Sequence, residues 1–108
     1  MTVSHAPTSP VPQEVSTELQ RVVERWRQLP LDRALSYAGR VRALVQSLAD
    51  RVAEAQGIAA SAVPDCGPAT LMDQLTVMVY DASAAAVPST ALISTLADDL
   101  ASLRRELV

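Results

Sequence analysis

Small apolar residues recur at intervals of three and four along residues 31–56, and this spacing constrains the fold more than any other feature. It places the residues on one stripe of a single long helix. A helix gains most of its stability by burying such a stripe against other elements. We therefore expect a protein of packed helices, with the stripe formed by Leu31, Ala34, Ala38, Val41, Val45, Leu48, Val52 and Ala55.

Three further segments have helical periodicity and helix boundary signals. Proline suits the first turn of a helix and glycine the position just past its end. Pro12, Pro68 and Pro88 each precede an amphipathic segment, and Gly57 follows the long one. No segment alternates like a strand. The sequence predicts an all-α protein, an antiparallel four-helix bundle with helices at about 12–29, 31–56, 68–83 and 88–107.

The length of 108 residues is that of one domain. Residues 1–11 are rich in proline, serine and threonine without periodicity, so we expect a flexible N-terminal tail. Residues 12–108 then form a single helical-bundle domain. His5 lies alone in the tail, and a metal site there would lack a second ligand.

Composition excludes several classes of function. The net charge of −3 argues against nucleic-acid binding, which needs basic residues to neutralise phosphates. No apolar run reaches the roughly 20 residues of a membrane span, and no secretory signal precedes the first helix, so we expect a cytoplasmic protein. The absence of lysine and asparagine beside abundant alanine is typical of a high-GC bacterial genome.

Charge is distributed unevenly along the chain. Residues 1–54 hold seven arginines against six acids, whereas residues 55–103 hold five aspartates and no base. Such a division can steer two copies, or a basic partner, into register. Packing of the two parts against each other within one molecule explains the division equally well.

The long helix outruns its neighbours, so its distal half needs a cover. That cover is either a second copy of the chain or the 57–67 loop. Val77 and Tyr80 fall outside the buried arc of the third helix. We therefore predict a protein-interaction module of adaptor or regulatory type, a homodimer with two-fold pairing, that could also bind another protein. Its candidate interface is Val45, Leu48, Val52, Val77 and Tyr80.

An alternative function is a regulatory bundle that binds a small molecule between helices near Tyr37, Tyr80 and Arg40. A crevice with buried polar groups would favour it, and a filled core would oppose it.

Arg33, Arg40 and Arg51 line the face of the long helix opposite its apolar stripe. This face is either solvated or a site for an anion or a partner.

No set of residues predicts catalysis, a cofactor or a metal, and we expect no enzyme activity. Cys66 precedes a helix N-terminus, where a thiolate is favoured, but the only histidine is in the tail. The thiol is thus either a redox-sensitive group or an incidental turn residue. Asp73 and Asp81 lie two turns apart, yet the Glu-x-x-His pairs of helical di-metal sites are absent. A salt bridge to an arginine, or plain solvation, explains them better.

Overall fold

The computed structural model describes residues 10–86 and 89–108, which form four α-helices and no strand. The helices are α1 (Gln13–Gln28), α2 (Leu31–Gln56), α3 (Leu71–Ala86) and α4 (Thr90–Glu106). A 3₁₀ turn, η1 (Pro68–Thr70), leads into α3. The all-α bundle predicted from the sequence is confirmed, and α2 has the predicted bounds.

Local chemistry sets the helix ends. Gly57 has the left-handed φ of 69° that ends α2, and the Ile58 N–H donates to the Ala53 carbonyl. Ser89 caps α4 by accepting a hydrogen bond from the Leu92 N–H. Asp65 Oδ1 accepts a hydrogen bond from the Gly67 N–H at 3.0 Å, just before Pro68 opens the 3₁₀ turn. α3 starts at Leu71, directly after this turn.

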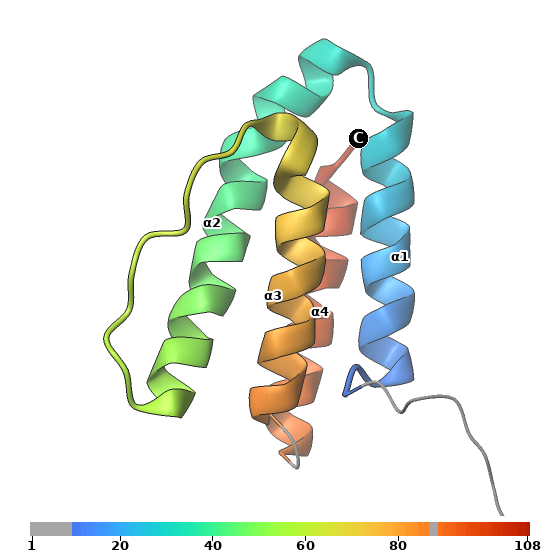
Figure 1. Ribbon diagram of the computed structural model, residues 1–108. Coiled ribbons are helices and arrows are strands. Elements are labelled where there is room, and N and C mark those ends of the chain that lie inside the picture. Colours follow the sequence, from blue (N-terminus) through green and yellow to red (C-terminus); the bar gives the residue numbers. More distant parts are fainter. Residues whose placement is uncertain (1–9, 87–88) are drawn as a thin grey trace, which may run out of the picture.

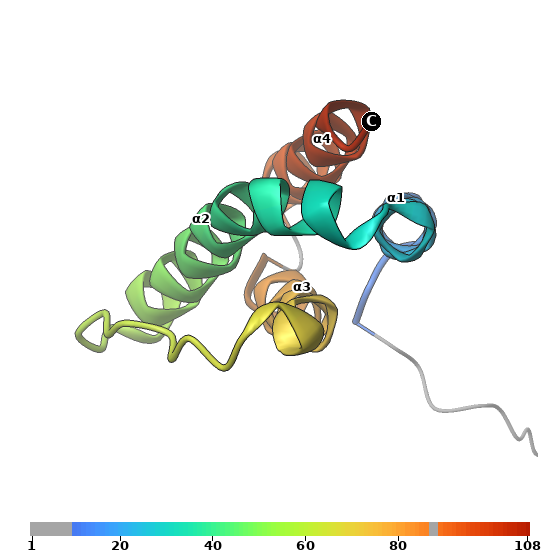
Figure 2. The ribbon, with the colours of Figure 1, turned by 90° about the horizontal axis from the view of Figure 1, so that it is seen from above.

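The order of helix directions is up, down, down, up (Figure 1). α3 and α4 run antiparallel, as do α2 and α4, whereas α2 and α3 run parallel to each other (Figure 1). α1 and α4 also run parallel, and the C-terminal residue lies near the far end of α1 (Figure 1). Seen along the bundle, the start of α2 passes over the top from α1 before the helix descends (Figure 2).

Residues 57–67, which we call the strap, produce the parallel pair. They carry the chain back along the outside of α2 to the level where α3 begins (Figure 1). Gln46 on α2 accepts a hydrogen bond from the Val63 N–H at 2.8 Å and donates to the Ser61 carbonyl at 3.0 Å. Arg42 pairs with Asp65 at 3.1 Å. The strap thus lies against α2 instead of making a short helical hairpin.

The core is built from leucine, valine and alanine of all four helices. α2 packs mainly against α3, and α1 mainly against α4, while α1 and α2 pack little on each other. The predicted flexible tail concerns mostly residues 1–9, which lie outside the described residues. Val11, placed in that tail, packs half-buried against the core instead. The fully buried large side chains are Leu48, Leu71, Leu75, Leu96, Leu100, Leu103, Leu107, Val15, Val22, Val41, Val45 and Val79.

Candidate functional site

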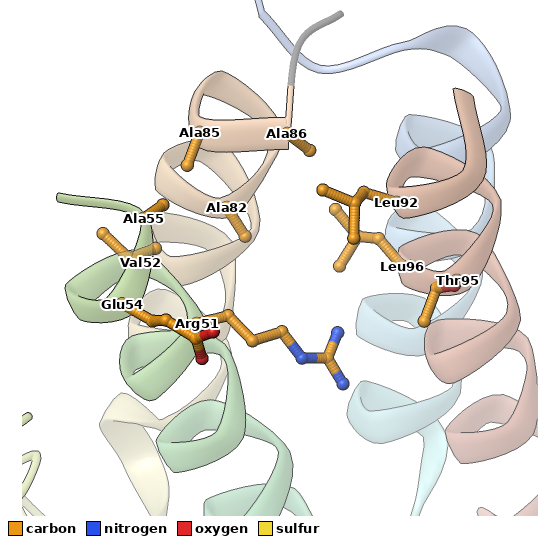
Figure 3. Close-up of a pocket in the computed structure, with 10 residues that line it drawn as sticks. All are labelled: Arg51, Val52, Glu54, Ala55, Ala82, Ala85, Ala86, Leu92, Thr95 and Leu96. Carbon is orange, nitrogen blue, oxygen red and sulfur yellow. The ribbon is translucent and has the colours of Figure 1, made fainter. Parts of the chain in front are cut away.

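A pocket of about 350 Å³ lies at the end of the bundle where α2 and α3 finish and α4 begins (Figure 3). Its walls are mainly apolar side chains, among them Val52 and Ala55 of α2, Ala82 of α3 and Leu96 of α4. The size falls within the range of ligand pockets, which are mostly apolar with a few polar groups. Its apolar lining is more extensive than that of the pockets beside the α1–α2 turn and beneath residues 58–64.

Alanines on α3 leave the pocket open. Ala82, Ala85 and Ala86 face α2 and α4 across it, where larger side chains would fill the space (Figure 3). Leu92 stands at the rim from the first turn of α4 and is 55% exposed. Its neighbour Ile93, at the same end of α4, is buried, so the two side chains lie on different sides of the helix.

Arg51 supplies the charge at the pocket. Its side chain reaches from α2 toward α4 (Figure 3), and its Nη2 lies 2.8 Å from Asp99 Oδ2. That carboxylate oxygen is buried, and the contact has the geometry of an ion pair more than of an aligned hydrogen bond. The guanidinium therefore lies against the buried oxygen of a carboxylate whose side chain is 32% exposed. Glu54 at the rim and the Thr95 hydroxyl complete the polar groups.

The candidate interface residues divide between core and surface. Val45 and Leu48 are buried within a single chain and have no surface to offer a second one, so they must be removed from the predicted interface. The physical reason is that α2 packs along α3 within the chain, with Val63 of the strap also packed against the core. Val52 is half-buried between two pockets. Val77 and Tyr80 are 53% and 51% exposed on α3.

The arginines predicted to line one face of α2 are engaged with the end and side of α4. Arg33 donates to the main-chain oxygen of Val108. Arg40 binds both carboxylate oxygens of Glu106 at 3.0–3.1 Å, and Arg51 pairs with Asp99. Of the two explanations for the uneven charge, packing within one molecule therefore accounts for this stripe.

The structure does not assemble the small-molecule site predicted near Tyr37, Tyr80 and Arg40. The Tyr37 hydroxyl donates to the Val108 main-chain oxygen at 3.2 Å, beside the Arg40–Glu106 pair. Tyr80 lies on the exposed face of α3. Neither the Tyr37 hydroxyl nor the Arg40 guanidinium is hydrogen-bonded to α3. The pockets at the α2–α3–α4 end, at the α1–α2 turn and beneath the strap are not lined by these three residues.

The other polar candidates do not converge. Cys66 is a free, exposed thiol in the strap. Asp73 is exposed and Asp81 half-exposed, and within the described ranges neither pairs with an arginine. Residues 10–86 and 89–108 contain no cluster of three or more potential metal ligands. His5 lies outside these ranges.

The carboxylate of Glu18 has a shifted pKa. Glu18 Oε1 accepts a hydrogen bond from Arg104 Nε at 2.8 Å, which joins α1 to α4. This hydrogen bond lowers the pKa of Glu18 below its ordinary value of 4.5, and the charges of Arg104, Arg21 and Arg105 act in the same sense. Partial burial opposes the shift without reversing it. Arg21, on the same helix as Glu18, lies farther from the carboxylate at 3.5 Å.

No protein family model, curated protein or solved structure matches this chain. None of the helices in the described residues is both long and apolar enough to span a lipid bilayer.

Proposed function

We propose that this protein is a small helical-bundle interaction module that self-associates through the end of the bundle formed by α2, α3 and α4. The observation that carries the proposal is the apolar pocket with Leu92 exposed at its rim. Partly filled pockets beside exposed large apolar side chains are typical of protein interfaces, where such a residue becomes a buried anchor.

A second copy of the chain suits this surface because each copy carries both the pocket and an exposed leucine side chain that can enter the pocket of the other. In a two-fold dimer the Leu92 side chain of each copy faces the pocket of the other. The rim carries Glu54 beside Arg51. In a two-fold dimer the carboxylate of one copy can therefore lie opposite the guanidinium of the other. We propose that this dimer acts as an adaptor or regulator in the cytoplasm.

The test is sedimentation velocity of the full chain over a range of concentrations. We expect the wild type to approach twice 11.5 kDa and Leu92→Glu to weaken the dimer by at least about thirtyfold. Leu35→Glu is the matched control, because Leu35 is 51% exposed at the opposite end of α2. A wild type that stays monomeric at high concentration, or equal effects of both variants, would refute the proposal.

A second candidate function is the binding of a small apolar molecule, which the volume and lining of the same pocket favour. It predicts that the monomer binds an apolar fluorescent probe such as anilinonaphthalene sulfonate. Ala85→Trp should then abolish the signal by filling the pocket from its rim, while Leu35→Glu should leave it intact. Equal probe fluorescence in both variants would contradict this candidate.

A further inference from the structure

The helix α3 carries a second row of side chains on the side away from the core. The row follows intervals of four, three and four residues, and its members are all exposed: Asp73, Val77, Tyr80 and Ala84. Such intervals place side chains on one stripe of a helix, and they are the spacing by which one helix packs along another. We call this row the outer seam. It extends about 16 Å along α3 at 1.5 Å per residue.

The described part of the chain leaves the outer seam uncovered. α3 packs mainly against α2, α4 and η1. Seen along the bundle, α4 and the start of α2 lie on one side of α3, and no helix of the described residues lies on the opposite side (Figure 2). Val77 and Tyr80 remain 53% and 51% exposed. Tyrosine, with an apolar ring and a polar hydroxyl, is a residue type enriched at protein interfaces.

The charges along this side of α3 are negative. Asp73 belongs to the outer seam and Asp81 flanks it, and neither pairs with an arginine within the described ranges. Eight residues separate the two carboxylates, which is about 12 Å along the helix. Residues 55–103 contain no basic residue, so α3 supplies no cation of its own. Asp65 and Asp99, in contrast, pair with arginines of α2.

These charges decide which occupant fits. Two outer seams placed face to face would bring four carboxylates together without a cation, and like charges oppose association. A helix with arginine or lysine residues two turns apart, and apolar residues between them, complements both the carboxylates and the apolar side chains. The Tyr80 ring also suits a cation placed over its face.

We propose that the outer seam of α3 binds a basic amphipathic helix of a partner protein, which packs along α3 and places its cations against Asp73 and Asp81. None of the seam residues lines the pocket at the end of the bundle. The contact is therefore separate from the surface proposed for self-association and does not depend on it.

A synthetic helical peptide serves as the probe, with leucines at intervals of four and three residues, arginines on both flanks and no acidic residue. Its binding to the full chain is measured by fluorescence anisotropy of a label on the peptide. We expect Tyr80→Ala to weaken binding at least about tenfold, because an aromatic anchor is lost. Asp73→Asn with Asp81→Asn should also weaken it, and should remove most of its dependence on salt.

Matched controls come from other faces of the bundle. Leu35→Ala removes a side chain that is 51% exposed on α2, and Asp98→Asn removes an exposed carboxylate on α4. Neither should change the affinity for the peptide. Failure of the wild type to bind the basic peptide would overturn the proposal, as would equal affinities for the wild type, Tyr80→Ala and the controls.

A charge exchange gives a second measurement that loss of binding alone does not. Asp73→Arg with Asp81→Arg should reject the basic peptide and bind the version in which glutamates replace the arginines. In nuclear magnetic resonance spectra of the wild type, the basic peptide should shift the amide signals of Val77 and Tyr80 and leave that of Leu92 unchanged. Unchanged peptide preference, or shifts confined to the pocket residues, would overturn the proposal.

Discussion

Replacing Gly39 and Gly57 with alanine should shift the stability of the protein in opposite directions, although both substitutions add the same methyl group. A Cβ built at either position meets no atom within 4 Å, so neither substitution creates a clash. Gly39 lies inside α2 and has no positive φ, whereas Gly57 has a φ of 69°. The difference in outcome therefore comes from the backbone alone.

Alanine within a helix is more stable than glycine by about 1 kcal/mol. An alanine in the left-handed conformation loses about 1–2 kcal/mol. Unfolding entropy scales with chain length, and for 108 residues 1 kcal/mol corresponds to about 4 °C in melting temperature. We expect Gly39→Ala to melt about 4 °C higher than the wild type, and Gly57→Ala about 4–9 °C lower.

Both changes in melting temperature can be measured by thermal unfolding, followed by the helical circular dichroism signal at 222 nm. Ala43→Gly is the reverse control, because Ala43 is exposed on the same helix and should lose what Gly39→Ala gains. A lower melting temperature for Gly39→Ala would refute the reasoning. It would mean that the path of α2 over the top of the bundle depends on glycine at this position.

Three further substitutions probe the core and its links. Leu48 is fully buried, so Leu48→Ala should lower the free energy of unfolding by about 3–5 kcal/mol in chemical denaturation; a loss under about 1 kcal/mol would place it outside the core. The Ser83 hydroxyl is buried without a hydrogen-bond partner, so Ser83→Ala should raise stability by about 1 kcal/mol, and a decrease would reveal a bonded hydroxyl. The folded pKa of Glu18 lies below 4.5, so its stabilising effect is present above that pH and is lost as the pH falls through the folded value. Wild type should therefore lose more stability on acidification than Glu18→Gln, and parallel pH profiles would contradict the role of the Arg104 hydrogen bond.

Periodicity was sufficient to predict the helices because each one buries a single stripe. The stripe through Val41 and Val45 defined α2, and Gly57 marked its end. Helix direction was harder, because an eleven-residue connection can serve a hairpin or a crossover. The pairing of Gln46 and Arg42 with the strap favours the crossover, and the strap residues in these contacts have no periodic signal in the sequence.

The pocket could not be predicted for a related reason. Ala82, Ala85 and Ala86 satisfy a helical pattern whether they touch another helix or line an open space. Leu92 has the spacing of a core residue, yet it is exposed at the pocket rim. The run of small residues near the end of α3 was the available signal. These small residues indicate a pocket only once α2 is known to end beside them.

The parallel arrangement of α1 and α4 has a mechanical consequence. The start of α1 and the end of α4 lie at opposite ends of two neighbouring helices (Figure 1). Tension applied to Pro12 and Val108 would slide these helices along each other, so that the side-chain contacts between them resist together and not one after another. A bundle with both attachment points at the same end would separate from that end under less force.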